Sequence, residues 1–254
     1  MRAFFAEART LIEKELKSDV VLHESDHLGF MAMCFLYKQT AHSRSIEMLL
    51  DARQDADAAT ISRTMLEGLI LVAWAALEPE ERPLRWRAFS LVSDWKLVKR
   101  GGTPPFGTPE DKKADLEQRL NAHPEFLTSG ARRVGTQKLF DPYQNTWHVN
   151  GDGSRVELRT MAEEIGDPDM KLLYDELSQV GHWTPRGVVF NIDHSAARST
   201  LAFMDESLAA QACGTAFSAL VQTAALFFLH HREEPHLRLQ QLIDSYVAAL
   251  VKRD

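Results

Sequence analysis

The sequence predicts an all-α protein, a single-domain bundle of about seven to nine helices with an irregular middle segment. Apolar residues recur at spacings of three and four almost throughout the 254 residues, and the alternation typical of half-buried strands is scarce. Hydrophobic residues make up 44% of the chain and charged residues 26%, a balance that supports a sizeable core. The sequence contains no repeat and no long linker, so we expect one domain over residues 1–254.

In the first part of the chain, cap and breaker residues set the expected helix boundaries. Ser25 or Asp26 can cap the second helix, and Pro79 fits the first turn of the fourth. The basic Arg100 followed by two glycines ends that fourth helix. The expected helices cover about residues 3–17, 25–53, 55–77 and 79–100. The first helix should bury one apolar face made of Phe4, Ala8, Leu11, Ile12 and Leu16.

The middle segment, about residues 101–155, is expected to be an irregular excursion. Glycines and prolines interrupt every apolar period there, except in a short charged helix from Pro109 to about His123. Regular helices resume near residues 156–165 and 169–182. A turn at 185–187 and a short extended piece at 188–192 follow. A long apolar helix and a last helix from about His236 complete the chain.

The long apolar helix raises the question of a membrane span. No charged residue occurs between Leu208 and Leu229, and a run of this length can cross a bilayer. The run is rich in alanine and contains glutamines, serines and threonines, which favour insertion poorly. We therefore expect the central helix of a bundle and no membrane interaction.

The N-terminus, the cysteines and the charge balance bear on location and partners. Acidic residues interrupt the apolar N-terminal residues, unlike a secretory signal, and Cys34 and Cys213 lie in apolar helical stretches. Two such cysteines are typical of small buried side chains in a reducing compartment, so we expect a cytoplasmic protein. The net charge of −7 argues against a broad nucleic-acid footprint but leaves a local basic patch open.

One motif matches a zinc-protease pattern letter by letter, His23-Glu24-Ser25-Asp26-His27. That chemistry needs both histidines on one helical face and the glutamate beside a zinc-bound water. Glu47 and Asp51 follow at positions where a third ligand and its supporting acid would be sought. Because Ser25 and Asp26 are typical helix caps, His23 should precede the helix. We therefore interpret the match as an inter-helix turn and expect neither a metal nor another cofactor.

A second set of polar residues has more functional promise. Arg63 and Glu67 are four residues apart in a strongly apolar helix, and Tyr174, Ser178 and His182 are spaced by four in another. A charged pair in apolar surroundings is expensive unless it is satisfied by a partner or a ligand. Each set forms a polar stripe on its helix. We expect these two stripes, one on each helix, to meet in one polar centre. The alternatives are a solvated face or a structural network that fixes the helix register.

These residues carry a family resemblance. Arg63-Thr-Met-Leu-Glu67, Trp147, the segment 161–166, Tyr174 and Leu177-Ser178-Gln-x-x-His182 resemble a bacterial family of unknown function, domain of unknown function 5677. The similarity extends from about Ala41 to Trp183, and Gly181 replaces the usual bulkier residue. The resemblance implies a helical fold with a shared polar centre and no established activity. The candidate residues it implies are Arg63, Glu67, Tyr174, Ser178 and His182.

Two functional hypotheses follow. In the first, the protein is a hydrolase or an analogue of the HEPN-type ribonucleases, with His182 as general acid/base and Arg63 binding an anionic group. The usual Arg, four to six residues, then His of those enzymes is absent, because Arg186 and His194 are too far apart. In the second, it is a non-catalytic binding or interaction module, in bacterial stress or phage defence, whose centre binds a small anionic ligand or only locks the bundle. A small anionic ligand, a nucleic acid and a second copy in a homodimer are the partners considered.

Overall fold

The computed structural model describes residues 2–17, 20–102, 109–136, 139–180, 192–195, 198–201, 206–232 and 236–251. By its internal contacts the chain divides into two units. The first unit combines residues 1–77 with 161–254, and the second is made of residues 78–160. This division does not test the predicted single domain, which stays a prediction.

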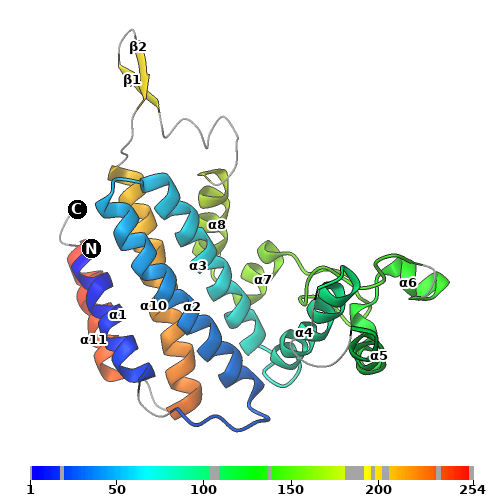
Figure 1. Cartoon of the computed structure of the whole chain (residues 1–254). Coiled ribbons are helices and arrows are strands. Elements are labelled where there is room, and N and C mark those ends of the chain that lie inside the picture. The colour runs from blue at the N-terminus through cyan, green and yellow to red at the C-terminus, as the bar shows by residue number, and fades with distance from the viewer. Residues whose placement is uncertain are drawn as a thin grey trace. The chain divides into compact units, whose positions relative to one another are not determined.

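Three long helices form the centre of the first unit (Figure 1). They are α2 (His27–Asp51), α3 (Asp55–Ala76) and α10 (Glu206–Arg232), and each packs against the other two. Helix α1 (Arg2–Leu16) contacts α2 and α10, and α11 (Leu237–Val251) contacts α1 and α10. Helix α8 (Pro168–Val180) packs on α3, and α7 (Leu158–Ile165) precedes it in the chain.

The core of the first unit lies where α3 and α10 meet. The sequence predicts that eight residues of these two helices are buried, because they are bulky apolar members of the two most apolar helices. The expectation is confirmed, since none of them exposes more than 3% of its surface. They are Leu66, Leu69, Ile70, Val72, Trp74, Phe217, Leu220 and Phe228.

The second unit has its own hydrophobic core. Its helices are α4 (Arg82–Lys99), α5 (Pro109–Leu120) and α6 (Ser129–Val134), with one 3-10 turn, η1 (Pro124–Phe126). Trp95, Phe126 and Tyr143 are buried together, and the Trp95 and Tyr143 rings meet in a T-shaped arrangement at a centroid distance of 4.9 Å. The irregular segment is therefore built around α4, whose apolar side packs on α5 within this unit.

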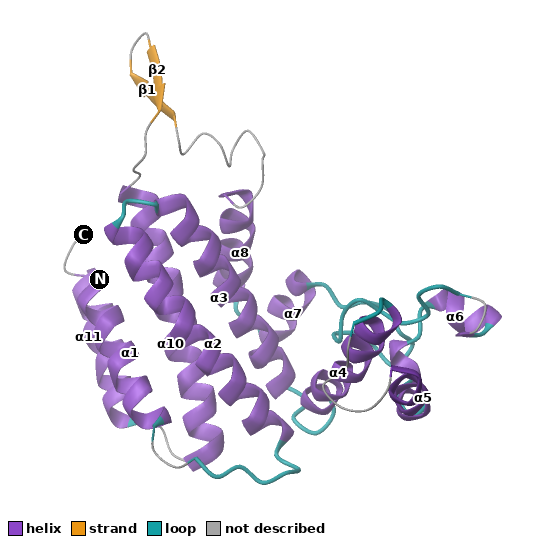
Figure 2. Cartoon of the chain, viewed as in Figure 1, coloured by secondary structure: helices purple, strands orange, loops and turns teal. Residues whose placement is uncertain are grey.

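The observed secondary structure is all-α, as predicted, with one small exception. Strands β1 (Ile192–Ser195) and β2 (Arg198–Leu201) form an antiparallel hairpin in which Ile192 lies opposite Leu201 (Figure 2). The part of the chain that the structure describes holds ten α-helices, so the predicted seven to nine was too low. The short α6 was missed because the glycines around it hide its period.

One predicted boundary is wrong. Helix α4 begins at Arg82 and not at Pro79, because residues 78–81 form a turn in which the Glu81 N–H donates to the Glu78 carbonyl at 3.2 Å. Pro83 occupies the first helical turn instead, where its missing N–H costs nothing. The other end is as predicted, with Gly101 in the left-handed conformation at φ +83°.

Helices α3 and α10 are both long and apolar enough to cross a membrane. In their most apolar windows, 56% and 67% of the residues are buried inside the protein. Core helices of soluble proteins pass the same test of length and composition, so these two helices carry little weight as evidence of a membrane span. The expected absence of membrane interaction stays a prediction.

Both cysteines are free thiols. Cys213 is buried on α10, as expected, whereas Cys34 on α2 is only half-buried. Burial raises the pKa of both thiols above the ordinary cysteine value. At neutral pH they therefore stay protonated, in keeping with their interpretation as small apolar side chains, and the cytoplasmic location stays a prediction.

Candidate functional site

The candidate site lies where α3 packs against α8. Residues four apart on a helix share one face, so Arg63 and Glu67 project from the same side of α3. Tyr174 and Ser178 likewise project from one side of α8. Because these two sides face each other, the polar stripes meet as the sequence predicts.

Arg63 is the hub of the site. Its Nε donates to the hydroxyl oxygen of Ser178 at 2.9 Å, and its Nη2 donates to the Tyr174 hydroxyl at 3.0 Å. The same Nη2 lies 2.8 Å from the Glu67 carboxylate. The guanidinium carbon is 5.0 Å from the centroid of the Tyr174 ring, within cation–π range. None of these contacts uses Nη1.

Ser178 completes the network from the α8 side. Its hydroxyl donates to the Tyr174 carbonyl at 2.6 Å, so its oxygen lone pairs are left to accept from Arg63. The hydroxyl orientation is therefore fixed by the helix that carries it. Through Ser178, the Arg63 side chain of α3 is linked to the Tyr174 backbone carbonyl of α8.

The ion pair at this site is only half-buried. The Arg63 and Glu67 side chains keep 21% and 25% of their exposure. Solvent therefore reaches both charges, which lowers the desolvation cost that a fully buried pair would carry. Glu67 also offsets the positive charge of Arg63, so the pair as a whole is close to neutral.

His182 lies outside the described residues, since the structure describes α8 only as far as Val180. The predicted meeting of the Arg63–Glu67 pair with Tyr174 and Ser178 is confirmed, and the position of His182 stays a prediction. Arg186 also lies outside the described residues, and His194 is placed in β1.

The same helices make polar contacts that the residue spacing did not identify. The indole Nε1 of Trp74 donates to Glu164 of α7 at 2.7 Å, and Gln211 of α10 donates to Glu176 of α8 at 2.8 Å. Trp74 lies three turns beyond Arg63, roughly 16 Å along α3, so its contact is separate from the Arg63 site. Both contacts pair single polar groups, and such pairs leave no periodic signal in a sequence.

The zinc-like motif forms a helix cap. Asp26 is the N-cap of α2, and its carboxylate accepts from the Gly29 N–H at 2.8 Å. His23 lies before the helix and hydrogen-bonds the Ser25 hydroxyl at 2.7 Å, whereas His27 is the first residue of the helix. The two histidines therefore do not share a helical face, as the sequence interpretation held.

The downstream acids of that motif are also engaged elsewhere. Glu47 pairs with Arg9 and Asp51 pairs with Arg2, both on α1. Glu47 is twenty residues from His27, a rise of about 30 Å along the helix. Within the described ranges, no three of the His, Cys, Asp and Glu side chains come together in a group that could hold a metal ion.

Fold and site together define a class, a helical protein with an arginine-centred polar site between two packed helices. The chain belongs to the Family of unknown function (DUF5677), whose profile matches residues 29–198. The match covers more than half of the chain and includes all five candidate residues. Comparisons with curated proteins and with solved structures gave no significant match.

Proposed function

We propose that the Arg63 site binds an anionic substrate and that the protein is a hydrolase with nuclease-like chemistry. One observation carries the proposal. The Arg63 guanidinium is fixed by contacts at Nε and Nη2, none of which uses Nη1, while 21% of the side chain stays exposed. An arginine held in one plane before the ligand arrives loses little further entropy on binding a phosphate oxygen.

The proposed chemistry gives each residue one task. Arg63 binds a non-bridging oxygen of a phosphoester and stabilises the negative charge that develops there. Glu67 and Ser178 hold the guanidinium in position, and Tyr174 supports it through its ring and hydroxyl. A water molecule attacks phosphorus and gives up a proton to solvent as the bond from phosphorus to the leaving oxygen breaks. His182, four residues beyond Ser178 in sequence, transfers its proton to that leaving oxygen as general acid. Glu67 lowers the affinity for the anion in the ground state, because its charge is 2.8 Å from Nη2.

A specific observation favours a second candidate, a structural or ligand-binding centre without catalysis. Arg63 already has three partners within the protein, Glu67, Tyr174 and Ser178. Such a network can serve only to fix the register of α8 on α3, as polar networks in other helical proteins do. The two candidates differ in what they require of His182, which a purely structural centre does not need.

The test compares hydrolysis of single-stranded RNA and of a model phosphodiester by four proteins. They are the wild type, His182→Ala, Arg63→Lys, and Arg9→Lys as the matched control. Arg9 is also ion-paired on a helix and keeps 20% side-chain exposure, so its substitution controls for loss of a half-buried arginine. We expect activity to fall at least 100-fold in the first two variants and to persist in the control.

Binding of inorganic phosphate, measured by calorimetry, separates the two candidates. Phosphate binding that is lost in Arg63→Lys, without hydrolysis by the wild type, would favour the non-catalytic candidate. Neither hydrolysis nor phosphate binding by the wild type, or equal activity in all four proteins, would overturn the assignment of a function to the Arg63 site.

A further inference from the structure

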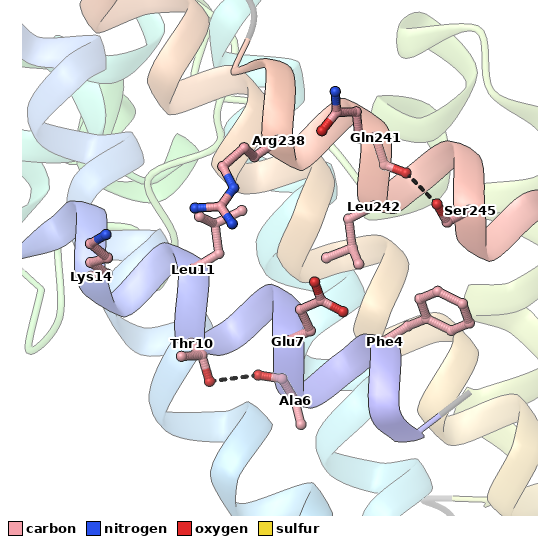
Figure 3. A pocket seen from close by; sticks show the side chains of 10 residues that line it. All are labelled: Phe4, Ala6, Glu7, Thr10, Leu11, Lys14, Arg238, Gln241, Leu242 and Ser245. Atoms are coloured by element: carbon pink, nitrogen blue, oxygen red, sulfur yellow. Dashed lines mark hydrogen bonds between the residues drawn. The ribbon is translucent and has the colours of Figure 1, made fainter.

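A groove runs along the outer side of the first unit between α1 and α11 (Figure 3). Its volume is about 670 Å³. Phe4 and Leu11 of α1 and Leu242 of α11 form its apolar part. Phe4 and Leu11 were expected in the core, but the face of α1 that is fully buried carries Phe5, Ala8 and Ile12 instead. The two residues are therefore left partly exposed in the groove.

Charged side chains are distributed unevenly along this groove. Lys14 of α1 and Arg238 of α11 lie at one end, and Glu7 lies toward the other end with its carboxylate directed between the helices (Figure 3). Across the described ranges of the chain, none of these three side chains makes an ion pair. The groove thus has a basic end and an acidic position, each without a charged partner among the residues that the structure describes.

The two charges of α1 lie on either side of a point near Thr10 and Leu11. Glu7 and Lys14 are seven residues apart, which is close to two helical turns, so they lie on the same stripe. The point midway between them falls at Thr10 and Leu11. If two α1 helices meet antiparallel across a two-fold axis at this point, each Glu7 faces the Lys14 of the other helix. Arg238 of α11, which Figure 3 shows next to Leu11, adds positive charge to the half of the groove that contains Lys14.

We propose that this groove is the interface of a homodimer, in which α1 and α11 of one copy pack antiparallel on those of a second copy. A two-fold interface must be self-complementary, and the groove meets this condition in charge and in its apolar middle. The surface is small, because α1 and α11 have 15 residues each and a length of roughly 22 Å. The interface is therefore at the low end of the range for specific complexes, and dimerisation depends on concentration.

Sedimentation velocity over a range of protein concentrations tests the proposal. The wild type should shift from monomer to dimer as its concentration rises. Glu7→Lys and Lys14→Glu, each alone, should weaken dimerisation at least 10-fold, because like charges then face each other twice in the symmetric pair. Glu80→Lys, an exposed substitution in the second unit, is the matched control and should dimerise like the wild type.

A mixture of the two charge variants, Glu7→Lys and Lys14→Glu, is the most specific test of the proposal. The Glu7→Lys chain presents only positive charges at the paired positions and the Lys14→Glu chain presents negative ones, so the mixed dimer should form where neither variant dimerises alone. Thr10→Arg, an exposed substitution at the axis, should also prevent dimerisation, since two arginines would meet each other. Circular dichroism shows whether each variant keeps its helical content.

Three results would overturn the proposal. The first is a wild type that stays monomeric at the highest concentration that remains in solution. The second is a dimer that Glu7→Lys, Lys14→Glu and Thr10→Arg leave as strong as the control. The third is a mixture of folded charge variants that forms no mixed dimer. Any of these would mean that another molecule, or solvent alone, occupies the groove.

Discussion

Arg63 on α3 donates from Nε to the hydroxyl of Ser178 on α8 at 2.9 Å, although 115 positions separate the two residues in the sequence. This contact fixes one register of α8 relative to α3. A shift of α8 by one turn would move Ser178 away from Nε, so the two hydrogen bonds to Ser178 and Tyr174 would not form together. The side chains thus determine how the helices align, and the alignment in turn orients the guanidinium.

Glu67→Ala should lower the free energy of unfolding by about 1–2 kcal/mol, because it removes the carboxylate partner of Arg63. A fully buried pair would lose about 3–5 kcal/mol, but these two side chains keep 21% and 25% exposure and water can replace the lost partner. Urea unfolding at pH 7 measures the change. Glu80→Ala is the control, since Glu80 is exposed, and it should be close to neutral. A cost at Glu67 no larger than at Glu80 would mean that the ion pair does not stabilise the fold.

Tyr174→Phe and Ser178→Ala should each cost about 0.5–1.5 kcal/mol, since each removes one neutral acceptor from Arg63. Tyr174→Phe keeps the ring under the guanidinium, so its cost should be the lower of the two. Ser90→Ala is a matched control, because Ser90 is exposed and its hydroxyl donates to the Arg87 carbonyl of its own helix. If Ser178→Ala costs no more than Ser90→Ala, then the hydrogen bond across the helices contributes nothing measurable.

The Arg63 site could be predicted because it is periodic. Arg63 and Glu67 stand out against an apolar helix, and the spacing of Tyr174 and Ser178 shows that they share one face. The energetic cost of unpaired polar groups then indicates that the two stripes meet. Position 182 follows the same spacing, but its contacts depend on the residues after Val180, which the structure does not describe.

Other features of the structure have no periodic pattern in the sequence that would predict them. Phe4 and Phe5 are adjacent apolar residues at the start of α1, and only the packing against α10 and α2 decides that Phe5 is buried and Phe4 is not. The core of the second unit is assembled from α4, α5 and loop residues such as Tyr143 and Val149. Contacts between helices and irregular chain have no fixed sequence period, so periodicity could not reveal this core.

Asp26→Asn should make the fold less stable at neutral pH and equally stable in acid. Burial alone would raise the pKa of Asp26, but hydrogen bonds from the Gly29 N–H and His230, with the charge of His230 and His231, outweigh it and lower the pKa. A carboxyl with a lowered pKa in the folded state stabilises the fold once it is ionised. The stabilisation is complete above the ordinary pKa of aspartate, about 4, and is lost as the pH falls through the lower folded value.

The difference in unfolding free energy between wild type and Asp26→Asn, measured from pH 7 to pH 3, checks this sign. Asparagine is as good an N-cap as aspartate, so the variant removes the charge and keeps the cap. A difference that stays constant, or that grows toward acid, would contradict the proposed role of the Asp26 carboxylate.

Removal of metal should have no effect on this protein. His23 precedes α2 and His27 starts it, so the two imidazoles cannot form the helical zinc pair of the protease motif. We expect elemental analysis of the purified protein to find no stoichiometric zinc, and treatment with a chelator to leave the Tm unchanged. A Tm that falls with chelator and recovers when zinc is added back would show that a metal binds after all.

The hydrogen bond between Trp74 and Glu164 has a consequence for how this chain can vary in length. Trp74 is near the end of the stretch of the first unit that precedes residue 78, and Glu164 is near the start of the stretch that follows residue 160. The hydrogen bond therefore joins these two stretches close to where the chain leaves the first unit and close to where it re-enters that unit. Because both ends of the segment 78–160 are held by contacts within the first unit, that segment can change in length or sequence during evolution. The packing of the helix that carries Arg63 would not be disturbed.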